Sequence, residues 1–147
     1  MSTKPILAIG SDHAGYEYKE ILRGMLADEG YEVINFGTDS SASVDYPDFV
    51  HPVCDAMGKG NAAVGILLCG SANGVAMAAN RHKHIRAAVC WDTEIAHLSR
   101  AHNDANVICL PCRFVAIELA HEMVEEFLKT PFEGGRHQRR VEKIECV

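Results

Sequence analysis

The chain has 147 residues, which is enough for one domain with a sizeable core. Its 14 basic and 20 acidic side chains give a net charge of −6, which argues against nucleic acid or an anionic membrane as the main partner. No apolar run approaches the length of a membrane span, and the first residues lead into a strand and not into the apolar core of a signal peptide. We therefore expect one cytoplasmic domain that covers residues 1–147.

In chain order, apolar runs of strand length alternate with helical patterns. The strands that these runs predict cover residues 5–10, 31–36, 63–68, 86–90 and 106–110. The predicted helices cover residues 16–29, 49–57, 72–79, 92–101 and 114–128. A tail from about 130 to 147 carries a basic cluster that includes Arg136 and Arg140.

This alternation predicts a parallel sheet that is covered by helices on both faces. We expect an α/β fold, a Rossmann-like three-layer α/β/α sandwich with a five-stranded parallel sheet. Ligands of such sheets lie outside the carboxyl ends of the strands. The polar groups that this edge would gather belong to Asp12, His13, Asp45, Tyr46, Cys69 and Arg113.

The turn after the third strand reads Cys69-Gly70-Ser71-Ala72-Asn73-Gly74. Backbone N–H groups at the start of the next helix favour anions, so they would stabilise a thiolate and lower the pKa of Cys69. Cys69 is therefore a candidate nucleophile, base or oxidisable thiol. The competing interpretation is a small buried residue at a strand end, which is common for a free cysteine.

The six cysteines follow no disulfide-framework spacing, which favours reduced thiols in the cytosol. Cys109 and Cys112 form a C-x-x-C pair. The sequence offers no second pair for a zinc site and no N-terminal placement of the thioredoxin kind. A thiol redox protein that uses this pair is thus a distant alternative.

Other motifs of this fold class are absent from the sequence. The first turn, residues 10–15, lacks the G-x-G-x-x-G signature and places Asp12 where it would repel a pyrophosphate. Val75 stands where a low-molecular-weight cysteine phosphatase needs an arginine, and there is no Walker or G-x-S-x-G pattern. A thiolate that faces backbone N–H groups suits proton abstraction next to a carbonyl, with the turn stabilising an enediolate.

Several motifs in order resemble the ribose-5-phosphate isomerase B group, which shares its fold with galactose-6-phosphate isomerase. The resemblance covers essentially the whole chain and runs through residues 10–15, 44–49, 69–71, 78–80, 85–88, 99–107 and 132–137. It implies interconversion of ribose 5-phosphate and ribulose 5-phosphate, in the non-oxidative pentose phosphate pathway, without a metal or another cofactor. The implied partner is a phosphorylated pentose.

The resemblance also implies roles for individual residues. Cys69 matches the base that moves a proton between C2 and C1, and His102 matches the acid that assists opening of the furanose ring. The turn residues that would hold the enediolate are Gly70, Ser71, Ala72, Asn73 and Gly74. The other substrate-binding positions match Asp12, His13, Tyr46, Asn103, Arg113, Arg136 and Arg140. Independently, a helix would place Arg136 and Arg140 on one face, where they could hold a phosphate dianion or form a solvated basic surface.

Two positions depart from the family pattern. The family's turn commonly reads Cys-Gly-Thr-Gly-x-Gly, and Ala72 stands here at its second glycine, so we expect a turn compatible with an ordinary residue. Cys112 lies where small or polar residues are usual. Neither change removes a side-chain group to which the resemblance assigns a role. Cys69 favours the ribose enzyme, because galactose-6-phosphate isomerase subunits generally lack that cysteine.

The positions of His102 and Asn103 predict how the protein assembles. The helix 92–101 leads away from the carboxyl edge, so both residues should lie near the amino edge, out of reach of Cys69 in the same chain. We therefore expect a homodimer with sites shared between subunits, and a tetramer is an alternative assembly.

Two alternative functions are compatible with the sequence. They are a hexose-phosphate isomerase for allose or galactose 6-phosphate and a phosphosugar-binding module without catalysis.

Overall fold

The computed structural model describes residues 3–146. Its strands are β1 (Leu7–Ser11), β2 (Val33–Asn35), β3 (Val64–Cys69), β4 (Ala87–Val89) and β5 (Val107–Pro111). Its helices are the 3-10 turn η1 (His13–Gly15) and α1 (Tyr16–Asp28), α2 (Pro47–Gly58), α3 (Asn73–Ala79), α4 (Thr93–Ala101), α5 (Ile117–Lys129) and α6 (Arg136–Glu142). The strands form one sheet in the order β2-β1-β3-β5-β4, and every neighbouring pair is parallel.

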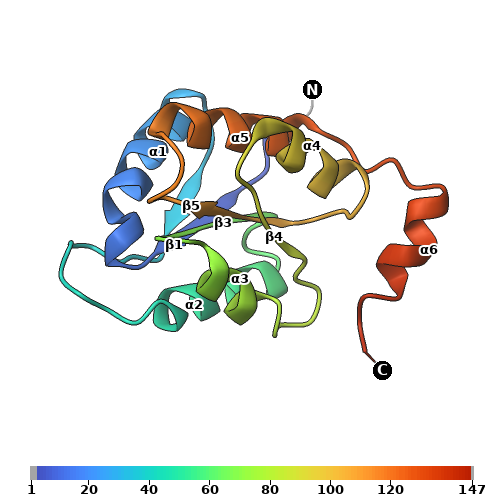
Figure 1. The fold of residues 1–147 in the computed structure, drawn as a ribbon, viewed down its shortest axis with the longest axis horizontal. Coiled ribbons are helices and arrows are strands. Elements are labelled where there is room, and N and C mark those ends of the chain that lie inside the picture. The colour runs from blue at the N-terminus through green and yellow to red at the C-terminus, as the bar shows by residue number, and fades with distance from the viewer. Residues whose placement is uncertain (1–2, 147) are drawn as a thin grey trace.

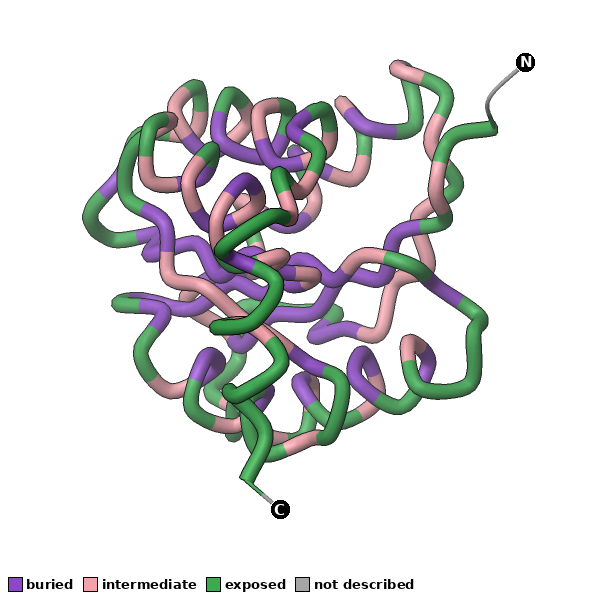
Figure 2. Tube along the Cα trace, turned by 90° about the vertical axis from the view of Figure 1, so that its right-hand side faces the viewer, coloured by how far each residue is buried: buried purple, intermediate pink, exposed green. Residues whose placement is uncertain are grey.

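The sheet is the middle of three layers (Figure 1). Leu22 of α1, Ala96 of α4 and Phe127 of α5 belong to the apolar cluster on one face. Val53 of α2 and Val75 of α3 belong to the cluster on the other face. Buried residues follow the strands through the centre, and exposed residues lie on the outer sides of the helices (Figure 2). The predicted α/β sandwich with a five-stranded parallel sheet is confirmed.

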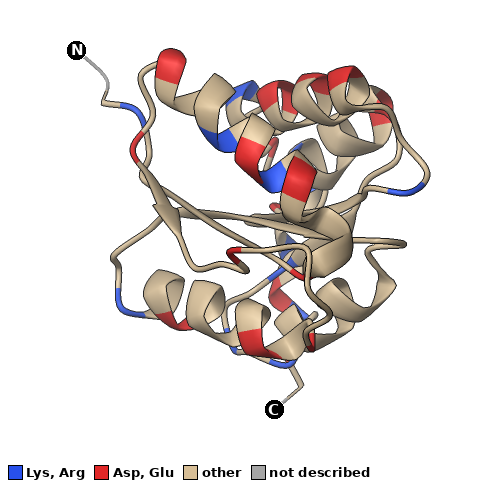
Figure 3. Ribbon diagram, turned by 90° about the vertical axis from the view of Figure 1, so that its left-hand side faces the viewer, with Lys and Arg blue, Asp and Glu red and all other residues tan. Residues whose placement is uncertain are grey.

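The central strands β1, β3 and β5 are almost completely buried. Because helices exclude water from both faces, these strands appear in the sequence as continuous apolar runs. None of the five strands contains Lys, Arg, Asp or Glu, and the charged side chains lie on helices and loops (Figure 3). Within residues 3–146, every helix is too short or too polar to span a bilayer.

Several element boundaries differ from the sequence prediction. β2 and β4 are shorter than predicted, and both are edge strands that pair with only one neighbour. α5 begins at Ile117 and not at residue 114, because the Phe114 N–H donates to the Pro111 carbonyl in a turn and Ala116 is extended. The tail contains α6, which stands apart from the three layers (Figure 1).

The strand order determines where a ligand can bind. β1 and β3 are neighbours, although the chain visits the outer strand β2 between them. Connections that leave adjacent strands in opposite directions open a crevice at the carboxyl ends, and open α/β sheets bind ligands there. The residues that directly follow Ser11 and Cys69 lie at this crevice.

Candidate active site

A cavity of about 400 Å³ opens at the carboxyl ends of β1 and β3. Its walls are formed by Asp12, His13, Ala14, Tyr46, Cys69, Gly70, Ser71, Gly74, Arg113 and Phe114. Ala72 and Asn73 belong to the same turn as Cys69. The fold therefore brings most of the predicted site residues to one place.

Hydrogen bonds fix Asp12 and His13 at the end of β1. Asp12 is buried, and its Oδ1 accepts from the N–H groups of Ala14 (3.0 Å) and Gly15 (3.3 Å), which caps η1. His13 Nδ1 accepts from the Val44 N–H at 3.1 Å. A neutral imidazole has one donor and one acceptor nitrogen, so this bond leaves the proton on Nε2. His13 can thus donate a hydrogen bond to a ligand oxygen.

The Tyr46 ring lies against the turn between β3 and α3. A Cβ added to Gly74 would meet the ring carbon Cζ of Tyr46 at 2.5 Å, so this close approach requires glycine. The Tyr46 carbonyl accepts from the N–H groups of Phe49 and Val50 at the start of α2, which anchors its backbone. The phenol is consequently held at the cavity wall beside the turn.

Arg113 is placed by hydrogen bonds that continue the pairing of β3 with β5. The Cys112 N–H donates to the Cys69 carbonyl at 2.9 Å, and the Arg113 N–H donates to the Gly70 carbonyl at 3.1 Å. The Arg113 side chain lies along Gly70, where an added Cβ would meet Arg113 Cδ at 3.2 Å. A guanidinium at this position can bind an anionic group of a ligand.

Burial dominates the behaviour of the Cys69 thiol, which is 5% exposed. Burial raises the pKa of Cys69, and the nearby Asp12 carboxylate raises it further. The backbone N–H groups of Val75, Ala72 and Ser71 act in the opposite direction, but the pKa stays above its ordinary value. The sequence predicted a lowered pKa, and that prediction is wrong because loss of hydration outweighs the N–H groups of the turn.

The turn accommodates Ala72 in a strained conformation. Ala72 has a φ of 66°, in the left-handed region that glycine adopts more readily. Its side chain is fully buried. The backbone N–H and the side-chain amide of Asn73 approach Ser71 Oγ at 3.4 and 3.2 Å. We expected a turn compatible with an ordinary residue, and that expectation is wrong, because the turn keeps a left-handed conformation at Ala72 that packing and local hydrogen bonds must hold in place.

His102 lies at the opposite edge of the sheet. It directly follows α4, shortly before β5 begins, and parallel strands begin at the amino edge. Its Nε2 is 3.9 Å from Glu133 Oε1, and its ring stacks on His137 with a centroid distance of 4.2 Å. Asn103 lines a separate cavity of about 570 Å³ between the β4 edge and the C-terminal segment.

Arg136 and Arg140 also lie away from Cys69. Both are exposed and one helical turn apart on α6, as the spacing predicted. Figure 1 shows α6 on the far side of the molecule from α1, whose start adjoins the cavity. Within one chain, the structure therefore separates these arginines, His102 and Asn103 from the thiol.

Comparison with known proteins identifies the family. Residues 7–144 match the family model described as Ribose/Galactose Isomerase. The chain belongs to this family. Ribose-5-phosphate isomerase B of Escherichia coli (strain K12) is 43% identical over 141 residues, which cover 96% of this chain and 95% of the relative.

Solved structures of ribose/galactose isomerase family members have the same fold. A ribose 5-phosphate isomerase from Thermotoga maritima is 47% identical with a TM-score of 0.94, covering 97% of this chain and 98% of the other. Ribose-5-phosphate isomerase B from Mycoplasma genitalium with bound ribulose-5-phosphate is 43% identical with a TM-score of 0.90, covering 94% and 92%.

The sequence prediction of site residues missed Phe114, Glu133 and His137, among others. Phe114, which is 75% exposed, lines the cavity because α5 starts later than its apolar pattern suggested. Glu133 and His137 contact His102 across the tail. Their i, i+4 spacing was a signal that they lie close to each other, but nothing in the sequence placed them beside His102.

Proposed function

We propose that this protein interconverts D-ribose 5-phosphate and D-ribulose 5-phosphate, with Cys69 as the base. The observation that carries the proposal is the location of the thiol, in the cavity at the end of β3 and beside backbone N–H groups. Relatives named ribose-5-phosphate isomerase B support this substrate class, and one of them has ribulose-5-phosphate bound. The proposed enzyme acts in the cytoplasm, in the non-oxidative pentose phosphate pathway.

In the proposed reaction, Cys69 takes a proton from C2 of the open-chain aldose and returns it to C1. A hydroxyl proton passes from O2 to O1, so the carbonyl moves from C1 to C2. The intermediate enediolate carries negative charge on oxygen, and the N–H groups of the turn at residues 69–74 would stabilise it. A thiolate with a raised pKa is a strong base once it has formed, which suits removal of a proton from carbon.

The proposed enzyme is a homodimer in which each site combines two chains. A twofold axis can place α6 and His102 of each chain against the cavity of the other, because such an interface repeats the same contact twice. His102 would then protonate the ring oxygen of the furanose, and Asn103 would bind the sugar. Arg136 and Arg140 would bind the phosphate through charge-assisted hydrogen bonds. A tetramer built from such dimers is compatible with this arrangement.

The function is tested by isomerisation of ribose 5-phosphate with EDTA present. Wild-type protein should remain active, and Cys69→Ala should lower kcat roughly 10²- to 10⁴-fold, as expected for loss of a general base. The matched control is Cys112→Ala, which removes a buried thiol beside the cavity and should retain activity. An inactive wild-type protein would contradict the pentose assignment and direct assays to hexose phosphates. An active Cys69→Ala variant would contradict the role of the base.

A further inference from the structure

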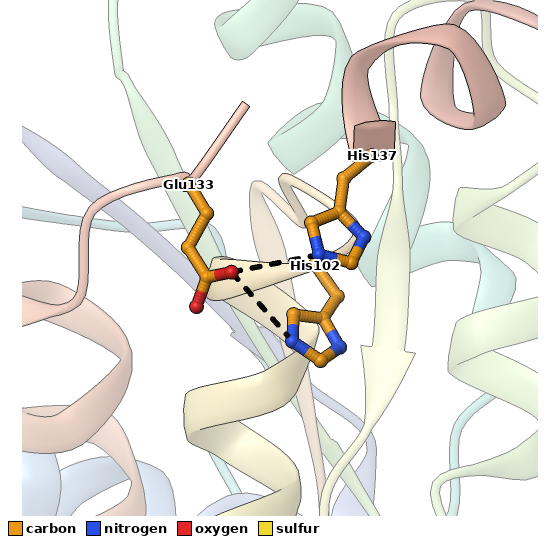
Figure 4. Close-up of side chains that lie close together, drawn as sticks. All are labelled: His102, Glu133 and His137. Carbon is orange, nitrogen blue, oxygen red and sulfur yellow. Dashed lines mark ion pairs between the residues drawn. The ribbon is translucent and has the colours of Figure 1, made fainter. Parts of the chain in front are cut away.

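Two histidines and a glutamate converge at the junction of α4 and α6. His102 Nε2 and His137 Nε2 lie 3.9 and 3.5 Å from the same oxygen, Oε1 of Glu133. One possible ligand atom from each of the three side chains lies within 4.8 Å of the other two. Figure 4 shows both imidazoles turned toward the carboxylate from one side, with their rings nearly parallel.

Backbone hydrogen bonds hold this cluster together. The Glu133 N–H donates to the Ala101 carbonyl at 3.0 Å, which ties the tail to the last turn of α4. The His102 N–H donates to the Leu98 carbonyl at 2.9 Å, and the His137 N–H donates to the Gly134 carbonyl at 3.0 Å. These hydrogen bonds hold the backbone of all three residues in place. His137 is also only 9% exposed.

The distances within the cluster are too long for hydrogen bonds and suit a shared ion. Hydrogen bonds between nitrogen and oxygen span about 2.7–3.2 Å. Ligand atoms at about 2.0–2.1 Å from a tetrahedral zinc ion lie roughly 3.3 Å from one another. The two separations from Glu133 must shorten to reach that value, and one of the stacked imidazoles must rotate so that both Nε2 lone pairs point at the ion.

A second cluster of similar composition shows the contrast. His121 uses both ring nitrogens, with Nε2 hydrogen-bonded to Glu29 and Nδ1 3.4 Å from Glu125. Its two carboxylates thus contact opposite sides of one imidazole. One ligand atom of each residue lies within 4.8 Å of the others in this cluster too, but its carboxylates contact different ring nitrogens, which makes it an ion-pair network and a control of similar composition.

We propose that His102 Nε2, Glu133 Oε1 and His137 Nε2 bind a divalent transition-metal ion of the zinc type. Imidazole nitrogen and carboxylate oxygen are zinc ligands, and three protein ligands leave one position for water. The ion occupies the lone pair of His102 Nε2, so it removes the acid that opens the sugar ring. Zinc is thus a reversible inhibitor of the isomerase reaction. This inhibition rests on the proposed function, whereas the binding of zinc does not depend on it.

Binding is tested by calorimetric titration of Zn²⁺ into the purified, substrate-free protein. Wild-type protein should bind one ion per chain at this site, and Glu133→Gln and His137→Gln should each weaken binding roughly tenfold or more. The matched control Glu125→Gln, in the second cluster, should leave affinity unchanged. If neither Glu133→Gln nor His137→Gln changes affinity, or if no ion binds, the site is refuted.

Thiols are the competing zinc ligands, and two measurements separate them from the cluster. Cys69→Ala should bind Zn²⁺ with wild-type affinity. Co²⁺ bound to the wild-type protein should lack the intense sulfur-to-metal absorption band of a thiolate complex. Loss of binding in Cys69→Ala, or a strong sulfur band, would overturn the proposal.

The inhibition is tested in the isomerase assay, with each variant compared with its own metal-free rate. Zn²⁺ should inhibit the wild-type enzyme, EDTA should restore the rate, and Glu133→Gln should need roughly tenfold more Zn²⁺. Equal sensitivity of the wild type and Glu133→Gln would overturn the inhibitory role. Because binding is measured without substrate, failure of the isomerase function and failure of the metal site give different results.

Discussion

The carboxylate of Asp12 and the thiol of Cys69 share one cavity, and the charge of the carboxylate contributes to the raised pKa of the thiol. Burial and the Asp12 charge both raise the pKa of Cys69. Replacing Asp12 with Asn removes the charge but keeps an oxygen that can cap η1. The pKa of Cys69 should therefore fall, which increases the thiolate fraction near pH 8. We predict that Asp12→Asn speeds alkylation of Cys69 by iodoacetamide roughly twofold to tenfold.

Mass spectrometry of the modified peptides measures this rate. Wild-type alkylation of Cys69 should continue to rise with pH beyond the ordinary range of a cysteine, because its pKa is raised. Exposed Cys146 reports the activity of the reagent, and fully buried Cys109 should stay unmodified while the protein is folded. Unchanged or slower alkylation in Asp12→Asn, with Cys109 still protected, would show that the carboxylate does not raise the pKa of Cys69.

At the scale of elements, the sequence predicted what depends on local pattern and missed what depends on tertiary contacts. β1, β3 and β5 were predictable as apolar runs because both of their faces are buried, and Asp12, Cys69 and Arg113 followed from the ends of those strands. The late start of α5 was not predictable, because the apolar pattern continues through the turn at Phe114. The raised pKa of Cys69 depends on burial and on a carboxylate from another strand, which no local pattern contains.

The position of α6 depends on a glycine that precedes it. Gly135 has φ 56° and ψ −130°, a conformation that other residues rarely adopt. No atom lies within 4 Å of a Cβ added there, so a substitution would act through backbone strain alone, at about 1–3 kcal/mol. We predict that Gly135→Ala displaces α6, with Arg136 and Arg140, and lowers kcat/KM roughly fivefold to hundredfold. The midpoint of thermal unfolding should change little, because α6 stands apart from the core (Figure 1).

The matched control is Gly24→Ala, in the interior of α1. A Cβ at Gly24 also meets no atom within 4 Å, and the helical backbone suits alanine. This variant should keep wild-type kcat/KM and gain about 1 kcal/mol of stability, because alanine is the better helix former. If Gly135→Ala and Gly24→Ala have the same kcat/KM for ribose 5-phosphate, the position of α6 does not matter for the reaction.

At the scale of the whole molecule, the proposed catalytic groups lie at opposite edges of one sheet. Cys69 ends β3 at the carboxyl edge, and His102 precedes β5 at the amino edge. The segment that carries His102 cannot move across the sheet, because Ala101 and Ala105 on either side of it are buried. A second chain is therefore the physical route by which an imidazole of this kind could reach the thiol.

Subunit mixing tests that route. Neither Cys69→Ala nor His102→Ala should be fully active alone, because every site in each homodimer lacks one group. After subunit exchange, each mixed dimer contains one site with both groups intact and one site with neither. With random pairing in an equal mixture, half of the dimers are mixed, so about a quarter of the wild-type sites should return.

The control mixture pairs Cys69→Ala with the double variant Cys69→Ala/His102→Ala, which contains no intact thiol and should recover no activity. Native mass spectrometry, on chains that differ in isotope label, shows whether mixed dimers form. Recovery in the test mixture and not in the control would establish that the acid and the base come from different chains. Absence of recovery while mixed dimers are present would show that the acid and the base of each site come from one chain. Full activity of a monomeric enzyme would lead to the same conclusion.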